Sequence, residues 1–260
     1  IDTIYQKLRQ LLIGKIYSTA DLAYYNQGQQ IPYAVVSNIN ASIDSVLLPA
    51  IASVQDSKEN VKKMTRRAIK TSSYIMTPFM IGIFVIAEKL VELLLTEKWL
   101  PCVFFLQISC ISFIFTPINT ANINAIKAIG RSEIILKIEI LKKVVGCVII
   151  LFTIFGGIKA IAMGLLLSNV VGQIINAWPN KKILDYGYFE QLKDIIPNIL
   201  LALCMGMIIN VVTVLKLSAL STIVVQIIFG MVIYVALSIV TRNESFFYLW
   251  NMIFQYTKSR

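Results

Sequence analysis

The sequence contains no histidine, which excludes histidine-ligated metal sites and catalysis by an imidazole base. Its four cysteines (Cys102, Cys110, Cys147 and Cys204) sit in apolar runs without any C-x-x-C pair, and we interpret them as small buried hydrophobic residues. No glycine-rich phosphate loop, catalytic triad or metal-ligand cluster is present. We therefore expect no enzymatic activity, no cofactor and no metal site.

Charged residues are also scarce. Only 15% of the 260 residues are charged, 57% are hydrophobic, and the mean hydropathy is +0.73. Soluble domains contain about 25% charged and about 45–50% apolar residues, so the composition excludes an ordinary soluble domain and indicates an integral membrane protein. Lys and Arg total 24 against 14 Asp and Glu. In a membrane protein this excess sets the orientation, and we expect no nucleic-acid partner.

Long polar connections are missing, so the chain is a series of apolar runs joined by short segments. A spanning helix needs about 20 mostly apolar residues. Six segments meet this requirement: 73–95, 100–126, 134–155, 159–179, 195–215 and 219–241. Two less apolar segments, 4–18 and 24–54, complete the series. We predict an all-α, polytopic membrane helix bundle of about eight transmembrane helices.

Lysine and arginine cluster in every second connection. Apart from the first residues, the basic segments are 58–70, 127–143, 181–193 and 242–260. Because these residues are enriched in cytoplasmic loops, the alternation predicts that both ends of this sequence are cytoplasmic. The chain opens with Ile1 and shows no leader segment, so we expect it to be part of a longer protein.

Polar side chains recur at helical spacing along 24–54. The stripe consists of Asn26, Gln29, Tyr33, Ser37, Asn40 and Asp44. Polar groups at membrane depth face the bundle interior or a watery cavity. The stripe therefore indicates either the lining of a cavity or hydrogen bonds between helices without any ligand. For Asp44 we favour the cavity.

A second polar set lies on and just after segment 100–126, which Pro117 interrupts. Its members are Ser109, Ser112, Thr116, Asn119, Thr120, Asn122, Asn124 and Lys127. A proline inside a helix removes a hydrogen bond and kinks it, and kinked transporter helices often mark the moving part or the binding site. The alternative is a helix with a wet cytoplasmic end, from which Lys127 extends to the headgroups.

The later spans differ, because 195–215 and 219–241 are nearly all apolar. We expect these two helices to pack on the outside of the bundle, with Asn210 and Gln226 bonded to neighbouring helices, and we place Asp194 at the membrane edge. A ladder of small residues predicts a close contact between helices. The ladder consists of Ala160, Gly164, Ser168 and Gly172.

Short motifs occur in a fixed order along essentially the whole chain. They are Leu12–Lys15 with Asp21–Tyr25, Leu48–Asp56, Lys98–Pro101, Ala125–Arg131 and Leu192–Pro197. This ordered set resembles the bacterial polysaccharide or O-antigen flippases of the Wzx type. They are oligosaccharide exporters in the superfamily that also contains the MATE-like multidrug exporters.

The resemblance implies a MATE-like parent of fourteen helices, of which this chain is the second half. Residues 1–180 would form the second six-helix transporter bundle. Residues 181–260 would add two further transmembrane helices, which could guide a polyprenyl tail, and a basic cytoplasmic tail.

The resemblance also implies a function. The parent would flip an oligosaccharide linked to undecaprenyl pyrophosphate across the bacterial cytoplasmic membrane for lipopolysaccharide, capsule or exopolysaccharide synthesis. An H⁺ or Na⁺ gradient would drive it, and a polysaccharide polymerase and assembly proteins would be its partners. The substrate-binding candidates are Asp44, Asn40, Ser37, Tyr33, Gln29, Asn124, Lys127 and Lys15. Cations suit the pyrophosphate, and those available near the cytoplasmic side are Lys7, Arg9, Lys15 and Lys127.

Three other functions stay open. A multidrug or small-solute exporter of the same superfamily would have a cavity richer in aromatic and carboxylate side chains. A membrane polymerase of the same pathway is disfavoured by the short outer connections and the missing catalytic groups. A scaffold without transport activity is disfavoured by the polar stripe on 24–54.

Overall fold

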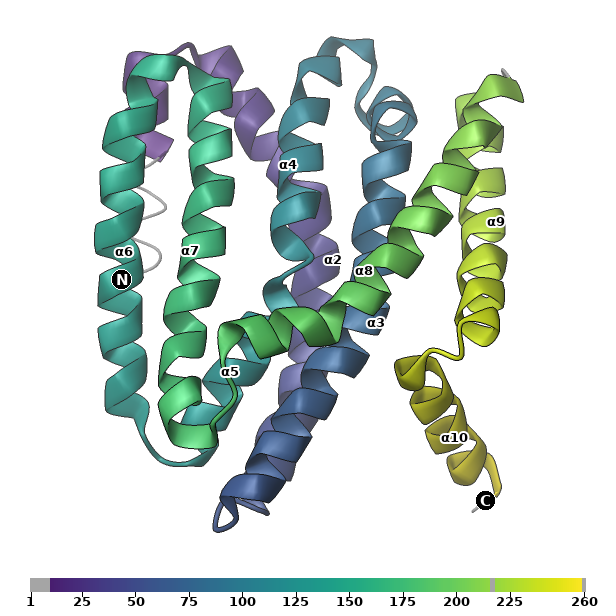
Figure 1. Cartoon of the computed structure of the whole chain (residues 1–260). Coiled ribbons are helices and arrows are strands. Elements are labelled where there is room, and N and C mark those ends of the chain that lie inside the picture. The colour runs from purple at the N-terminus through teal and green to yellow at the C-terminus, as the bar shows by residue number, and fades with distance from the viewer. Residues whose placement is uncertain (1–9, 216–217, 259–260) are drawn as a thin grey trace.

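The computed structural model describes residues 10–215 and 218–258, which form helices joined by short turns and contain no strand (Figure 1). The α-helices are α2 (Thr19–Ala52), α3 (Lys58–Leu95), α4 (Val103–Phe113), α5 (Thr116–Ala128), α6 (Ser132–Thr153), α7 (Ile158–Leu184), α8 (Tyr188–Asn210), α9 (Ala219–Val240) and α10 (Glu244–Lys258). Three short 3-10 helices accompany them: η1 (Glu97–Cys102), η2 (Ile154–Gly156) and η3 (Val211–Leu215). Residues 10–16 are helical as well. The all-α class is confirmed.

The observed helices follow the predicted spans closely. Within the described residues, four helices are long and apolar enough to cross a membrane: α2, α7, α9 and α8 with its extension to Thr213. The bent pair of η1–α4 and α5 would make a fifth. The predicted number of about eight spans stays a prediction, because the first nine residues lie outside the description and α3 and α6 are not among these helices.

Local sequence signals explain where several helices begin and break. Ser18 caps α2, because its hydroxyl accepts a hydrogen bond from the backbone N–H of Asp21 while the Asp21 carboxylate accepts one from Ser18. Pro117 lies in the first turn of α5 and cannot donate a backbone hydrogen bond to α4. The two helices meet at an angle of 43°, which confirms the predicted kink.

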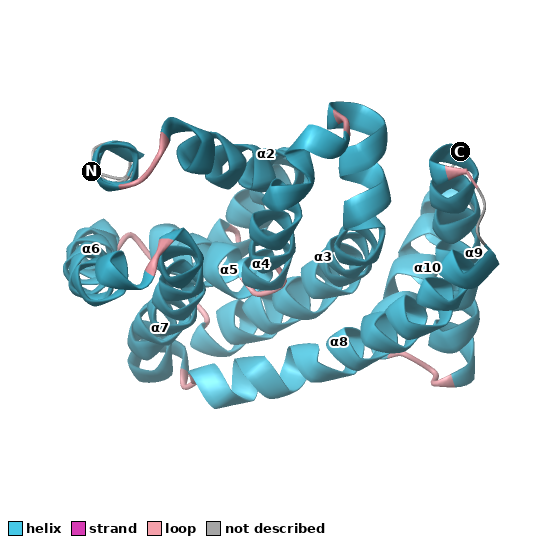
Figure 2. Ribbon diagram, turned by 90° about the horizontal axis from the view of Figure 1, so that it is seen from above, coloured by secondary structure: helices cyan, strands magenta, loops and turns pink. Residues whose placement is uncertain are grey.

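The long helix α3 is the central support of the fold. At 38 residues it is about 57 Å long, well above the roughly 30 Å of a bilayer core, so its first turns extend beyond the hydrocarbon. Its apolar part packs with α4, α8 and α9 around a core that contains Met76, Met80 and Met205. Seen from above, α6 and α7 lie on one side of the molecule and α9 and α10 on the other (Figure 2).

Cysteine burial only partly follows the expectation. Cys102 and Cys110 are buried in the core, as expected, whereas Cys147 and Cys204 are exposed on the outer faces of α6 and α8. In a bilayer those outer faces contact lipid, where a small hydrophobic side chain needs no burial by protein. The composition around a cysteine therefore predicted an apolar setting but not which side of the helix it occupies.

The connections that carry the most lysine and arginine all lie at one end of the bundle (Figure 1). The first turns of α3 and the α7–α8 turn even touch there, because the Lys62 ammonium donates a hydrogen bond to the backbone carbonyl of Asp185. The opposite end carries the α3–η1, α6–α7 and α8–α9 connections. The geometry therefore places 62–67 and 181–182 on the same side of any membrane the bundle crosses.

We predict that this basic end is cytoplasmic, because lysine and arginine are retained on that side. Single cysteines placed at Lys63 and at Lys181 should resist a membrane-impermeant thiol reagent on intact cells and react after permeabilisation. A cysteine at Gly157 of the opposite end should react on intact cells. Labelling of the first two positions from outside would refute the orientation.

Candidate functional site

A polar cavity with a volume of about 810 Å³ opens among α2, α4, α5, α6 and α7. Nine carboxamide side chains line it: Gln10, Asn26, Gln27, Gln29, Gln30, Asn119, Asn169, Gln173 and Asn176. The other polar groups are Tyr33, Ser109, Ser112, Ser168, Glu139, Lys142 and Lys143. Carboxamides both donate and accept hydrogen bonds, so this wall suits a ligand rich in hydroxyl groups.

Several buried polar atoms of this wall have no hydrogen-bond partner among the described residues. They are Gln29 Nε2, Ser112 Oγ, Gln173 Oε1 and Asn176 Oδ1. An unpaired polar atom in an apolar setting costs about 1–3 kcal/mol, so such atoms are normally satisfied by water or by a ligand. Four of them around one cavity mark it as a place where a hydrated or polar molecule binds.

Three charged residues line the cavity from the middle of α6. Glu139 pairs with Lys142 and lies 3.8 Å from the Lys143 ammonium, and all three side chains are at least three-quarters buried. Mid-membrane charges are expensive and almost always face a bundle interior or a watery cavity. Both lysines fall in the basic segment 127–143 and also in the predicted span 134–155. In the structure they lie on α6, which begins at Ser132, and they face the cavity.

The small-residue ladder on α7 explains how α6 comes so close. A Cβ atom built on Gly164 would lie 2.8 Å from the Thr153 side chain, so only glycine fits there. At Gly172 the nearest atom is Lys142 Cδ, 3.4 Å from such a Cβ. The aliphatic part of Lys142 therefore passes over Gly172 while its ammonium remains near the cavity. The predicted close helix contact is present.

Two of the predicted binding residues line this cavity, namely Gln29 and Tyr33. The Tyr33 side chain is 62% exposed and its ring lies against Phe113. On the same helix, Val35 and Ile39 pack against the protein core instead. The polar stripe of α2 thus begins at the cavity and turns away from the core, as an amphipathic helix should.

The other predicted residues of the stripe lie outside the cavity. Asn124 donates a 2.6 Å hydrogen bond to the exposed carboxylate of Asp44, and Thr120 donates one of 3.4 Å to Asn40. Ser37 bonds the backbone carbonyl of Ala34 on its own helix. These contacts join α2 to α5, and a binding role for these side chains stays a prediction.

The predicted cations are also away from the cavity. Lys15 and Lys127 are exposed and neither lines it. Lys7 and Arg9 lie outside the described residues. Lys142 and Lys143 are instead the cavity's cations.

The face of α7 that lines the cavity was missed by sequence reasoning. Asn169, Gln173, Asn176 and Asn180 are spaced by four, three and four residues, which places them on one side of the helix. This periodicity of amides inside an apolar span was the available signal. The small-residue ladder on the same helix predicted a close contact between helices, and the amides beside it were not considered as cavity lining.

A second polar network links α5, α7 and α8 below the cavity. Asn122 and Gln191 exchange two side-chain hydrogen bonds of 2.8 and 3.0 Å, and Asn180 donates one of 2.6 Å to Asn122. Asn122, Asn180 and Gln191 are fully buried. Paired amides of this kind hold helices together.

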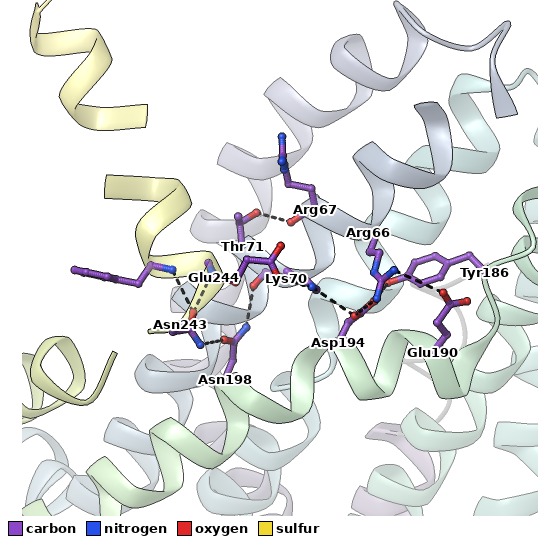
Figure 3. Close-up of polar contacts among 12 residues, drawn as sticks. Arg66, Arg67, Lys70, Thr71, Tyr186, Glu190, Asp194, Asn198, Asn243 and Glu244 are labelled. Atoms are coloured by element: carbon purple, nitrogen blue, oxygen red, sulfur yellow. Dashed lines mark hydrogen bonds and ion pairs between the residues drawn. The ribbon is translucent and has the colours of Figure 1, made fainter. Parts of the chain in front are cut away.

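The hub of the basic end is Asp194 on α8 (Figure 3). Its carboxylate, 5% exposed, accepts hydrogen bonds of 2.8 Å from both Arg66 and Tyr186, with the Lys70 ammonium 3.7 Å away. Burial raises the pKa of Tyr186, and the adjacent Asp194 raises it further, so the phenol stays protonated and donates. The placement of Asp194 at the membrane edge stays a prediction, and the structure adds that α3 and the α7–α8 turn cover its carboxylate.

Comparison with known proteins supports the resemblance read from the motifs. A family model described as polysaccharide biosynthesis protein matches residues 1–104. An uncharacterized membrane protein in the cps region of Klebsiella pneumoniae is 24% identical over 242 residues, which cover 90% of this chain and 49% of that protein. The lipopolysaccharide biosynthesis protein WzxC of Escherichia coli K12 is 24% identical over 196 residues, 75% of this chain and 38% of WzxC.

A solved structure shares the fold. The lipid II flippase MurJ in an inward closed conformation matches 87% of this chain and 48% of its own length, with a TM-score of 0.73 and 15% identity. The chain thus spans about half the length or less of the relatives it matches. The comparisons confirm the resemblance to Wzx-type flippases and the helical transporter fold. With the apolar helices, they show a multi-pass membrane protein.

We predict that Asp194→Asn destabilises the protein by about 1.5–3 kcal/mol, because Arg66 and Tyr186 lose a charged, buried acceptor. The measurement is the midpoint of thermal unfolding of the purified protein in detergent. Glu244→Gln is the matched control, since Glu244 is 79% exposed and its ion pair with Lys70 should contribute less than about 1 kcal/mol. Equal midpoints for the two variants would show that Asp194 does not hold α8 to α3.

Proposed function

We propose that this chain is the cavity-forming part of a membrane flippase that moves a polyprenyl-pyrophosphate-linked oligosaccharide across the bacterial cytoplasmic membrane. The observation that carries the proposal is the 810 Å³ cavity, walled by nine carboxamides and holding four unpaired buried polar atoms within a helical membrane bundle. The family match to polysaccharide biosynthesis proteins and the relatives WzxC and MurJ support the same class of cargo.

The difficulty of moving a sugar through hydrocarbon explains why carboxamide groups line the cavity. Sugar hydroxyls lose their water partners in hydrocarbon, at several kcal/mol each, so a bare oligosaccharide does not cross a bilayer. Carboxamide groups supply donors and acceptors in matched numbers and replace that water. They carry no charge, so lining the cavity with them avoids the greater desolvation penalty of carboxylates or ammonium groups. A lipid tail meanwhile stays among apolar side chains.

The charged part of the cargo calls for a cation at the cavity. Lys142 and Lys143 are the cations among the residues that line the cavity, and both lie close to Glu139. We assign the pyrophosphate contact to these two lysines. Glu139 holds them while the cavity contains water, and the phosphates replace it when cargo enters.

The multidrug alternative is distinguished by the lining. An exporter of cationic drugs needs carboxylates and broad aromatic surfaces. This cavity offers one carboxylate, Glu139, which is already paired, and the rings of Tyr33 and Phe113.

The experiment that tests the proposed function is deletion of the gene in its native host. The flippase proposal expects loss of surface polysaccharide and accumulation of the lipid-linked precursor on the cytoplasmic leaflet. Unchanged polysaccharide with increased drug sensitivity would favour the exporter.

We predict that Gln173→Leu lowers polysaccharide export several-fold, because a cavity hydrogen bond worth about 0.5–1.5 kcal/mol is lost and an apolar group faces the sugar. The Gln173 Oε1 atom has no hydrogen-bond partner among the described residues, so the substitution breaks no bond that this atom accepts, and leucine has a similar volume. The matched control is Asn210→Leu at the exposed end of α8. Both are scored by surface polysaccharide at equal protein abundance. Equal export by both variants would remove Gln173 from the sugar path.

We predict a larger loss, about tenfold or more, for Lys142→Gln combined with Lys143→Gln, because charge-assisted bonds to a phosphate contribute about 1.5–3 kcal/mol. Lys137→Gln is the control, since Lys137 is an exposed lysine one turn earlier on the same helix. The assay is export, together with the amount of lipid-linked precursor that co-purifies with each variant. Full retention of precursor by the double variant would exclude these lysines as the pyrophosphate contact.

A further inference from the structure

A basic pocket of about 410 Å³ lies between the first turns of α3 and the first turns of α10. Figure 2 shows α10 on the side of the molecule away from α6 and α7. Its lining residues are Lys63, Arg66, Arg67, Lys70, Thr71, Glu244, Ser245 and Tyr248. It shares no residue with the large polar cavity, and its walls come from other helices. The proposed transport cycle therefore gives it no role.

The charges of this pocket are not balanced. Four cations line it (Lys63, Arg66, Arg67 and Lys70), against the carboxylate of Glu244 in the lining and that of Asp194, which pairs with Arg66 and Lys70. Glu244 lines the pocket and is paired with Lys70 at 2.7 Å. Lys63 has no ion pair among the described residues. The Nε atom of Arg66 is buried without a hydrogen-bond partner there. The pocket thus combines an excess of two positive charges with an unused donor, which suits an anion.

Tyr248 holds one of the cations in place. The Arg67 guanidinium lies over its ring, 4.3 Å from the centroid, so α10 contributes an aromatic support as well as Ser245. A guanidinium stacked in this way keeps its N–H groups directed outward and recognises a phosphate through two donors.

An apolar groove of about 590 Å³ continues from the pocket, between α3, α8, α9 and α10. Its lining includes Tyr74, Pro78, Phe79, Gly82, Met205, Ile209, Ile227, Gly230, Met231, Tyr234, Val235, Phe246, Leu249 and Trp250. A Cβ built on Gly82 would meet nothing within 4 Å, so the groove is open there. Phe79 and Met231 are more than half exposed, so the groove also opens sideways to the bilayer.

The two cavities form one path along a single face of α3. Lys63, Arg67 and Lys70 are followed at the same spacing of three or four residues by Tyr74, Pro78 and Gly82. The apolar part from Lys70 to Gly82 is about 18 Å long, close to half the roughly 30 Å hydrocarbon core. The short helix α10 serves both, with Tyr248 in the pocket and Trp250 in the groove.

We propose that this path is a binding site for an anionic membrane phospholipid. Its phosphate lies among Lys63, Arg66 and Arg67, and an acyl chain occupies the groove between α3 and α9. Such a lipid matches both the charge and the length of the path, and the lateral opening admits it directly from the membrane. Because residues of both α3 and α10 line the pocket, a lipid bound there holds α10 against the bundle. The proposal does not depend on the flippase function.

The test uses the purified full-length protein, stripped of lipid in detergent, and native mass spectrometry. Phosphatidylglycerol is titrated against phosphatidylcholine with the same acyl chains. Wild-type protein should retain phosphatidylglycerol preferentially. Lys63→Gln with Arg67→Gln should weaken that binding about tenfold or more, because each cation near an anionic lipid contributes about 1 kcal/mol. Lys181→Gln with Lys182→Gln, an equal charge loss at exposed residues of the same end, should leave it unchanged.

A variant of the apolar groove tests binding of the lipid's acyl chain independently of the charges in the basic pocket. Gly82→Phe fills open space, so it should fold normally and reduce binding of both phospholipids. Phosphatidylglycerol binding that is equal in wild type, the pocket variant and the groove variant would overturn the proposal. Preferential binding of a polyprenyl phosphate, displacing phosphatidylglycerol, would also overturn it and assign the path to the cargo's carrier.

Discussion

The need of every polar group for a hydrogen-bond partner away from water is the constraint on which this structure depends. In hydrocarbon an unpaired group costs several kcal/mol, so an amide inside an apolar bundle must pair with another amide or face a cavity. This chain does both. Asn122 and Gln191 are paired and tie α5 to α8, whereas Gln173 and Asn176 keep unpaired oxygens at the cavity. The same residue type thus builds the scaffold in one layer and the binding surface in the next.

The carboxylates Asp194 and Glu139 also differ in this way, one in a structural contact and the other at the cavity. Asp194 connects α8 to Arg66 on α3 and to Tyr186 in the preceding turn, so its contacts join parts of the chain far apart in sequence. Glu139, Lys142 and Lys143 lie on one helix, and their ion pairs join residues only three or four positions apart. The first arrangement suits a fixed joint. The second suits a site whose ion pairs must open when a charged ligand arrives.

Apolar run length and helix-breaking residues made most of the fold predictable, because both are local properties of the sequence. The segment 24–54 became α2, and Pro117 broke the segment 100–126 as expected.

The hydrogen-bond and ion-pair partners of polar residues depend on the packing of helices that are distant in sequence, and for these partners the sequence was less informative. The sequence did not show that α3 covers the Asp194 carboxylate, or that Lys142 faces a cavity. The C-terminal helix α10 lies where only a basic tail was expected, and the ring of its Phe246 packs against Tyr74 of α3, a residue far away in the sequence.

The break between α4 and α5 has an electrostatic consequence. Phe113, the last residue of α4, and Asn119, in the first turn of α5, both line the large cavity. The negative end of one backbone dipole and the positive end of another therefore meet at its wall. Irregular backbone at membrane depth is tolerated where it borders protein or water, and this position satisfies that condition. Part of the cavity's polarity is thus carried by peptide groups, so even a variant with every lining amide replaced by leucine would keep a permanent local field.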